Sequence, residues 1–379
     1  MFRIICAVII ALSLYAPKDA LSGDKLRILW LSSLPYDIKT QEPSPFWMRT
    51  KYYIEAAAED LGVEIVHAPY FDDYNLFVNL AKGYLGSNNP PDAVLFHNHK
   101  MRGEDVLEIA EEFGVPAFVF NAGFTTDEQG EPRGKYKKWI GEILPDDEFA
   151  GFVLMEALAE ECRLIHKEGT IQAVAFAGGR DSNPSILRVK GMNRYLNGNK
   201  GINMRQIFNT DWDPEKVALM IPPLASRYPE VALYWAASDA IAKTTAEQLT
   251  RLGYMPGEDF VTGGMDWLPE VIHMIEDGTL AASVGGHYIE GAWAVILIHD
   301  YLKGVDFAET GRLSFKTEMF PLTGSNISEF ADLIKMQDSD TVKRIDFKAY
   351  SRYYNPDMND YSFSIPETLK NLKGASSRE

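Results

Sequence analysis

The sequence predicts an α/β protein of two lobes, each built on a doubly wound parallel sheet. Short apolar runs alternate with amphipathic segments from residue 26 to about residue 306, which is the pattern of strand–helix units in a parallel sheet. The expected strands outnumber those that one twisted open sheet usually holds. The length of 379 residues also favours two domains over a single core.

Residues 1–22 have the pattern of an export signal that is removed from the mature protein. A positive residue precedes an apolar stretch at residues 4–15, and Ala20 and Ser22 place small side chains where a signal peptidase reads them. The apolar stretch is too short for a permanent membrane anchor. We therefore expect an exported, soluble protein of the periplasm, with the cleavage site open by a few residues.

The first lobe is expected to begin with a strand at residues 26–31, whose nearly unbroken apolar run is typical of a strand buried on both faces. Ser44 is a natural N-cap. Pro45 suits the first helical position because its missing N–H would have no helical partner there, which predicts a helix over residues 45–61. Further strands are expected at 64–67, 93–97, 117–121 and 139–144, and further helices at 72–85 and 103–113.

A turn-rich polar insertion at residues 122–138 is expected to form a surface hairpin or loop. The second lobe is predicted to have helices at 148–167, 185–196, 214–228, 240–252 and 268–276, and strands at 171–177, 204–208, 231–236, 260–263 and 281–284. A long helix at 288–302 and a strand near 313–317 follow. The chain after Ser325 is mostly polar and predicts only a tail.

The charge of the chain excludes several classes of partner. With 37 basic and 54 acidic residues the net charge is −17, and removal of residues 1–22 makes it −18. Such a surface repels nucleic acid phosphates and anionic lipids, so we expect no nucleic acid partner. Cys6 is lost with the signal, which leaves Cys162 alone and excludes an intrachain disulfide.

No catalytic or metal-binding motif is complete in the sequence. The glycines at 178–179 and 263–264 follow strands, but neither pair completes a dinucleotide or phosphate fingerprint. His97 and His99 have the spacing of metal ligands without a third ligand nearby. We therefore expect no metal, no cofactor and no enzymatic activity. An exported enzyme with a triad assembled from distant residues stays open as an alternative from another class.

Two aromatic residues, Phe46 and Trp47, stand at the start of the predicted first helix, beside the carboxyl end of the first strand. Ligands of open parallel sheets bind at that edge. Aromatic faces there suit the C–H side of a sugar ring, although an isolated pair of this kind also fits a core position. Hydrogen-bonding side chains recur at the other strand ends, and together they are suited to a polyol. They are His97, Asn121, Arg180, Asp181, Asn209, Trp212, Ser238, Asp239, Asp266 and Trp267.

Several segments in chain order resemble the type I periplasmic solute-binding proteins, the ribose- and galactose-binding group. They are residues 44–47, Asn121, 185–191 with Arg188, 209–213 with Trp212, 237–242, and 264–266. The resemblance implies a ligand set of Ser44, Phe46, Trp47, Asn121, Arg188, Trp212, Ser238, Asp239, Asp266 and His287. Two positions depart from the group: Ser238 stands where an Asn is common, and Gly286 where a polar side chain commonly closes the site.

A second resemblance, to the autoinducer-2 receptors of the same fold, rests on residues 46–49, 120–121 and 338–353. Those receptors partner a membrane sensor kinase. Met265 and Gly286 fall where that subgroup uses Trp and Arg, so we expect a different ligand here.

The first resemblance also implies a hinge that the chain crosses three times, near residues 145–147, 285–286 and 323–325. The boundaries expected from it are a signal at 1–22, an N-terminal lobe at 24–146 and 287–324, and a C-terminal lobe at 147–286 and 325–379.

Together these features predict a monomeric periplasmic receptor that closes on a sugar or related polyol and presents it to the membrane permease of an ABC importer. The alternative within the same fold is the ligand-binding subunit of a membrane sensor kinase. A DNA-binding regulator of the same fold is the least favoured hypothesis, because the export signal stands where an N-terminal helix-turn-helix would be.

Overall fold

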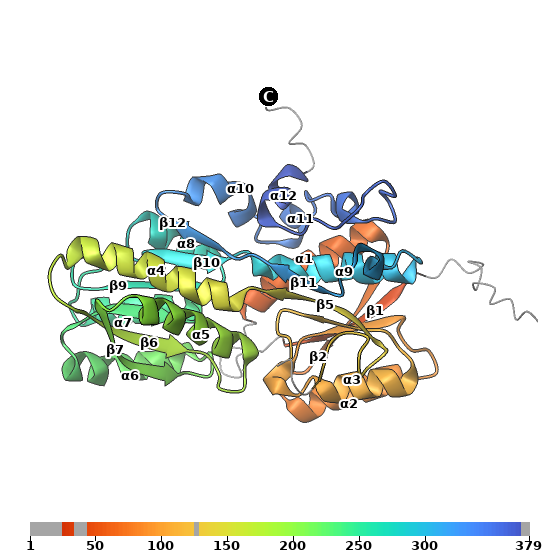
Figure 1. Ribbon diagram of the computed structural model, residues 1–379, viewed down its shortest axis with the longest axis horizontal. Helices are drawn as coiled ribbons and strands as arrows, with labels where there is room; N and C mark the ends of the chain where they lie inside the picture. Colours follow the sequence, from red (N-terminus) through yellow and green to blue (C-terminus); the bar gives the residue numbers. More distant parts are fainter. Residues whose placement is uncertain (1–24, 34–43, 125–128, 373–379) are drawn as a thin grey trace, which may run out of the picture.

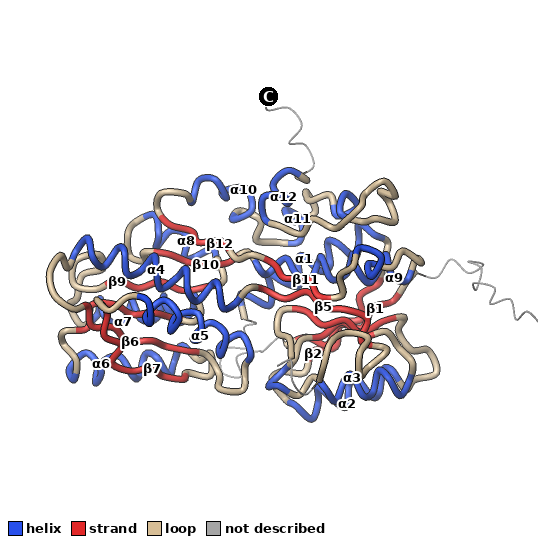
Figure 2. Tube along the Cα trace, viewed as in Figure 1, coloured by secondary structure: helices blue, strands red, loops and turns tan. Residues whose placement is uncertain are grey.

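The computed structural model describes residues 25–33, 44–124 and 129–372. They form two α/β lobes side by side, as the sequence predicts, each with one six-stranded sheet (Figures 1 and 2). The expected export signal, and part of the expected insertion at 122–138, lie outside the described residues. No helix of the described ranges is long and apolar enough to cross a membrane.

The sheet of the N-terminal lobe is parallel throughout, with the strand order β11-β5-β4-β3-β1-β2. Its strands are β1 (Arg27–Ser32), β2 (Glu64–Pro69), β3 (Ala93–Phe96), β4 (Ala117–Phe120), β5 (Trp139–Pro145) and β11 (Ser314–Thr317). Its helices are α1 (Pro45–Leu61), α2 (Tyr74–Leu85), α3 (Glu104–Phe113) and α9 (Glu290–Leu302). Helices α1 and α9 cover one face and α2 and α3 the other (Figure 1), which is why β1 is buried on both faces.

The sheet of the C-terminal lobe has the order β12-β10-β9-β8-β6-β7 and is parallel except for β12, which runs antiparallel to β10. Its strands are β6 (Ile171–Ala177), β7 (Ile202–Asn209), β8 (Val231–Ala236), β9 (Val261–Met265), β10 (Ala282–Gly285) and β12 (Phe320–Thr323). Its helices are α4 (Asp147–Ile165), α5 (Asn183–Gly198), α6 (Pro214–Arg227), α7 (Asp239–Arg251) and α8 (Pro269–Glu276).

Local signals set several element ends. Helix α1 has the predicted bounds, with Pro45 in its first turn and Gly62 at φ 71° closing it. Ser44 precedes the helix, but its side chain makes no capping hydrogen bond. Asp73 and Asp213 do cap α2 and α6, each accepting from two backbone N–H groups.

The third hinge crossing differs from the prediction. The chain passes from β11 in one sheet to β12 in the other at residues 318–319, whereas the crossing was expected near 323–325. Thr323 lies opposite Ala282 in the antiparallel pair, so residues 320–323 belong to the C-terminal lobe. The sequence pattern misplaces this boundary because β11 and β12 are short and separated by only two residues.

The tail after Ser325 is folded, and much of it packs on the N-terminal lobe, contrary to its predicted placement. It forms η4 (Ile327–Phe330), α10 (Ala331–Ile334), α11 (Ser339–Val342), η5 (Phe347–Tyr350) and α12 (Ile365–Lys370), with α11 and η5 against α1 and η5 also against α9. Figure 1 shows this blue segment lying over both lobes. Its buried apolar residues, such as Phe347 and Ile365, are spaced too widely to give a helical period.

A buried carboxylate at the end of α9 anchors the tail. Asp300 accepts hydrogen bonds from Ser351 Oγ at 2.5 Å, the Arg352 backbone N–H at 2.7 Å and the Tyr361 hydroxyl at 3.0 Å. These bonds join the end of α9 to residues 351–361, so Asp300 fixes where the tail lies on this lobe.

Replacing this anchor tests the packing of the tail. Asp300→Ala leaves the donors that meet this carboxyl group, among them Ser351 Oγ and the Tyr361 hydroxyl, without their acceptor. We therefore expect the free energy of unfolding to fall by about 2–4 kcal/mol. Urea denaturation followed by circular dichroism measures the change. The exposed Asp357→Ala in the same tail is the control. Equal stability of the two variants would contradict the assigned anchor.

Candidate functional site

Residues at the carboxyl ends of strands from the two sheets meet beside the hinge, and this region between the lobes is called the cleft. The lobes touch at its rim, where the Asn183 side-chain amide on α5 donates to the Gly123 carbonyl, 3.1 Å away in the N-terminal lobe. The Asn98 amide donates to the same carbonyl at 2.9 Å from its own lobe. The cleft is therefore bounded by strand-end residues of both lobes, the place where ligands of open α/β sheets bind.

The aromatic wall of the cleft comes from the first turn of α1. Phe46 stacks on His287 with ring centroids 4.8 Å apart, and Trp47 stacks on His97 at 4.7 Å. The two rings meet edge to face at 5.2 Å. Phe46 and Trp47 are both half-buried and pack partly against the core. The two interpretations of this pair, as core residues and as a surface for a sugar ring, are therefore compatible.

Arg188 of α5 is the centre of the polar wall. Its Nε donates to Asp147 Oδ1 at 2.7 Å, and its Nη1 donates to the Ala237 carbonyl at 2.7 Å. Its Nη2 lies 3.2 Å from His287 Nε2, and Asp266 Oδ1 lies 3.8 Å from Nη1. The guanidinium thus links the first hinge crossing, the end of β8 and the second crossing.

Two glycines explain how α5 brings Arg188 to this position. A Cβ on Gly151 of α4 would lie 1.9 Å from the Arg188 carbonyl oxygen. A Cβ on Gly191 would lie 1.8 Å from the Glu148 carbonyl oxygen. Helices α4 and α5 are therefore in backbone contact, and the glycine three residues after Arg188 is required by this packing.

Burial controls the charge of the groups around Arg188. It raises the pKa of Asp266 well above its ordinary value, with Arg188 opposing and Asp239 adding to the rise. Burial likewise raises the pKa of Asp147 against the effect of Arg188. Burial lowers the pKa of His287, and Arg188 lowers it further, so this imidazole is neutral and offers one donor and one acceptor.

Asp239 lies beneath the cleft surface. Its carboxylate accepts from the Leu268 backbone N–H at 2.8 Å and from Ser283 Oγ at 2.7 Å, and none of the residue is exposed. Ser238 Oγ accepts from the Ile241 N–H at 3.4 Å and caps α7. These contacts hold the loop that carries Asp266, which makes Asp239 a support for the site.

The remaining predicted residues are at strand ends. Trp212 follows β7 at φ 63°, its ring lies against Gly178, and the Arg188 guanidinium carbon is 5.7 Å from the ring centroid. Asn121 follows β4 at φ 63° and is buried. Ser44 is half-buried at the start of α1.

His97, at the end of β3, was noted at the rim but left out of the predicted ligand set. Besides stacking on Trp47, its Nε2 lies 2.9 Å from the Tyr70 hydroxyl, and its Nδ1 has no partner among the residues the structure describes. Its position directly after the third strand was the sequence feature that could have placed it in the ligand set. The described residues contain no group of three His, Cys, Asp or Glu side chains arranged to hold a metal ion.

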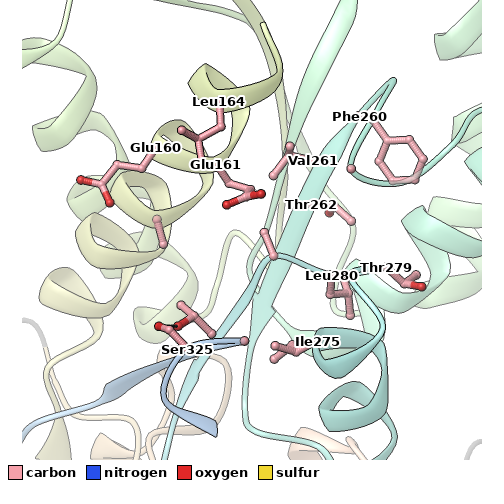
Figure 3. Close-up of a pocket in the computed structure, with 16 residues that line it drawn as sticks. Glu160, Glu161, Leu164, Phe260, Val261, Thr262, Ile275, Thr279, Leu280 and Ser325 are labelled. Carbon is pink, nitrogen blue, oxygen red and sulfur yellow. Dashed lines mark hydrogen bonds between the residues drawn. The ribbon is translucent and has the colours of Figure 1, made fainter. Parts of the chain in front are cut away.

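A separate surface pocket of about 440 Å³ lies in the C-terminal lobe near the starts of β9 and β10 (Figure 3). Glu160, Glu161 and Leu164 of α4 form one side, and Thr279 and Leu280 form another. None of the ten predicted ligand residues lines it, and it is at the end of the sheet opposite to the cleft.

Packing of α4 on α5 can be tested with two glycines of one helix. Gly191→Ala drives a Cβ into the Glu148 carbonyl, so we expect a loss of about 1–3 kcal/mol in stability and a displaced Arg188. Gly198→Ala is the control, because a Cβ there meets nothing within 4 Å. Thermal denaturation compares them, and identical midpoints would contradict the close approach.

Burial of Asp239 predicts a pH dependence of stability. Burial raises its pKa from 3.8 to about 7, so the folded protein holds this proton more tightly than the unfolded chain does. Its contribution to stability is therefore greatest at acidic pH and is lost as the pH rises from about 4 to about 7. Unfolding free energies measured across that range should fall less in Asp239→Asn than in the wild type. Parallel profiles would contradict the assignment.

A family model described as "Periplasmic binding protein domain" matches residues 38–306. A comparison with curated proteins gave no match.

Three solved structures illustrate the likeness of fold. A periplasmic sugar-binding protein from Pseudomonas fluorescens is 24% identical, with a TM-score of 0.80 over 91% of this chain and 99% of that one. An ABC transporter solute-binding protein from Agrobacterium vitis, bound with alpha-D-tagatopyranose, is 19% identical, with a TM-score of 0.69 over 81% and 97%. The binding component of the arabinose ABC transporter from Shewanella sp. ANA-3, bound to L-arabinofuranose, is 15% identical, with a TM-score of 0.69 over 83% and 97%.

Proposed function

The chain belongs to the periplasmic binding protein domain family, and we propose that it is a periplasmic receptor that closes on a sugar or related polyol. The observation that carries this proposal is the position of His287. Its ring stacks on Phe46 at 4.8 Å, while its Nε2 lies 3.2 Å from Arg188 and 3.6 Å from Asp266. The Phe46 ring and the Arg188 guanidinium are therefore separated by a single imidazole. This separation is short enough for one ring-sized ligand to contact both.

The chemistry of these groups matches a hydroxyl-rich ring. An arginine guanidinium and a carboxyl group hydrogen-bond to neighbouring hydroxyls of a sugar, and the faces of Phe46 and Trp47 pack on the C–H side of the sugar ring. Neutral His97 and His287 add directional hydrogen bonding without a net charge; burial lowers the pKa of both. Trp47, Phe46, Arg188 and Asp266 are the residues proposed to contact the ligand.

Binding energy then drives closure. A ligand that contacts Trp47 in one lobe and Arg188 in the other is bound fully only when the lobes meet, so it shifts the population towards the closed form. A micromolar dissociation constant corresponds to about 8 kcal/mol, more than enough to bias two arrangements that differ by a few kcal/mol.

We propose that the closed form presents its sugar to the permease of an ABC importer, with no chemical change to the ligand. The Agrobacterium and Shewanella proteins are described as parts of ABC transporters, which supports this partner over a sensor kinase. The N-terminal apolar segment supports export to the periplasm, and we propose that the receptor works there as a monomer.

Two substitutions test the cleft. We expect a thermal-shift screen of pentoses, hexoses, polyols and autoinducer-2 to find a sugar that raises the melting temperature of the wild type. Saturation at 100 times the dissociation constant adds about 2.7 kcal/mol of stability. Trp47→Ala and Asp266→Ala should each abolish that shift, because each removes one wall of the site.

Leu219→Ala is the matched control, since Leu219 is 78% exposed on α6. Calorimetric titration with the same sugar gives the affinity of each variant. Wild-type affinity in both Trp47→Ala and Asp266→Ala would overturn the proposed pocket, and release of a chemically altered sugar would revive the enzyme alternative.

A further inference from the structure

Arg49 of α1 is buried at the junction of the two lobes, only two residues after Trp47. Its Nη1 donates to the Trp267 carbonyl at 2.6 Å, and its Nη2 donates to the Leu333 carbonyl of the tail at 2.9 Å. Its guanidinium carbon lies 3.6 Å from the centre of the Tyr288 ring. Arg49 is 3% exposed, and no carboxylate of the described residues lies within ion-pair distance of it.

The loop that Arg49 grips is strained. Asp266 has φ 125° and Trp267 has φ 56°, in the region that favours glycine. Such conformations cost about 1–3 kcal/mol each and persist only where the surroundings hold them. The loop carries Asp266, the carboxyl group proposed to bind the ligand.

Contacts from both lobes hold the backbone of this loop. The Asp266 N–H donates to the Val284 carbonyl at 3.0 Å within the C-terminal lobe. Ser283 accepts from the Trp267 N–H at 3.2 Å, and Asp239 accepts from the Leu268 N–H at 2.8 Å; both come from the C-terminal lobe. Arg49 supplies a contact from the opposite lobe, through the Trp267 carbonyl. The conformation of the loop is therefore held by contacts from both lobes.

The surroundings of Trp267 place this contact at the hinge. Its indole N–H donates to the Ser283 and Phe320 carbonyls at 3.2 and 3.0 Å, and its ring lies against Gly285. Gly285 and Phe320 adjoin the second and third crossings. A contact at a hinge moves little when the lobes rotate, so Arg49 can hold the loop through closure.

We propose that Arg49 is a positioning residue that fixes the Asp266 loop from the opposite lobe. Arg49 acts through the Trp267 carbonyl without touching the ligand. The role for Asp266 rests on the proposed function, whereas the hold on the loop does not.

Hydrogen exchange in the ligand-free mature protein tests this hold. Arg49→Met keeps the length of the side chain and removes both donors. We expect the amides of residues 267 and 268 to exchange about tenfold faster, as loss of a charge-assisted hydrogen bond allows. Amides of β6 and β8 in the same lobe should keep their wild-type rates, which a general loss of stability would not allow.

Arg49→Lys keeps the positive charge but loses the planar guanidinium, so it should accelerate exchange at residues 267 and 268 by a smaller factor. If Arg49→Met does not fold, Arg49→Lys provides the test. The control is Arg205→Met, an exposed arginine of β7 paired with Glu230. Unchanged exchange at 267 and 268, or equal acceleration in β6 and β8, would overturn the proposal. Because no sugar is used, either result is independent of whether the cleft binds one.

Discussion

The guanidinium of Arg188 is the interaction on which the arrangement of the cleft depends. It pairs with Asp147 where the chain first crosses between lobes, contacts His287 after the second crossing, and donates to the Ala237 carbonyl at the end of β8. A buried arginine needs this many partners because an unpaired buried charge is costly. The glycines that bring α4 and α5 into backbone contact serve the same end, since they set the depth at which Arg188 enters the cleft.

Around this centre the molecule keeps several ionisable groups away from water. Burial raises the pKa of Asp266 and lowers that of His287, so both are pushed towards their neutral forms. Groups of this kind exchange hydrogen bonds with uncharged hydroxyls at little electrostatic cost. The strained backbone at Asp266 and Trp267 places one of them at the cleft, held by contacts from both lobes.

Much of this was predictable from local sequence. The bounds of α1 follow from Pro45 and Gly62. The strand-end rule singled out residues that do lie together, such as Phe46 on His287, because parallel strands bring their carboxyl ends to one edge. The third crossing and the tail were misplaced, because the β10–β12 pairing and the Asp300 anchor join residues far apart in the chain. For the same reason the supporting role of Asp239 required knowledge of its contact with Ser283.

The central claim is that one sugar is held by both lobes at once. A crystal structure of the protein with the sugar that gives the largest thermal shift tests it most directly. The account predicts a ring stacked on Trp47 with its hydroxyls on Arg188 and Asp266, and closed lobes around it. A sugar that contacts a single lobe, or that occupies the pocket beside Glu161 in Figure 3, would contradict it.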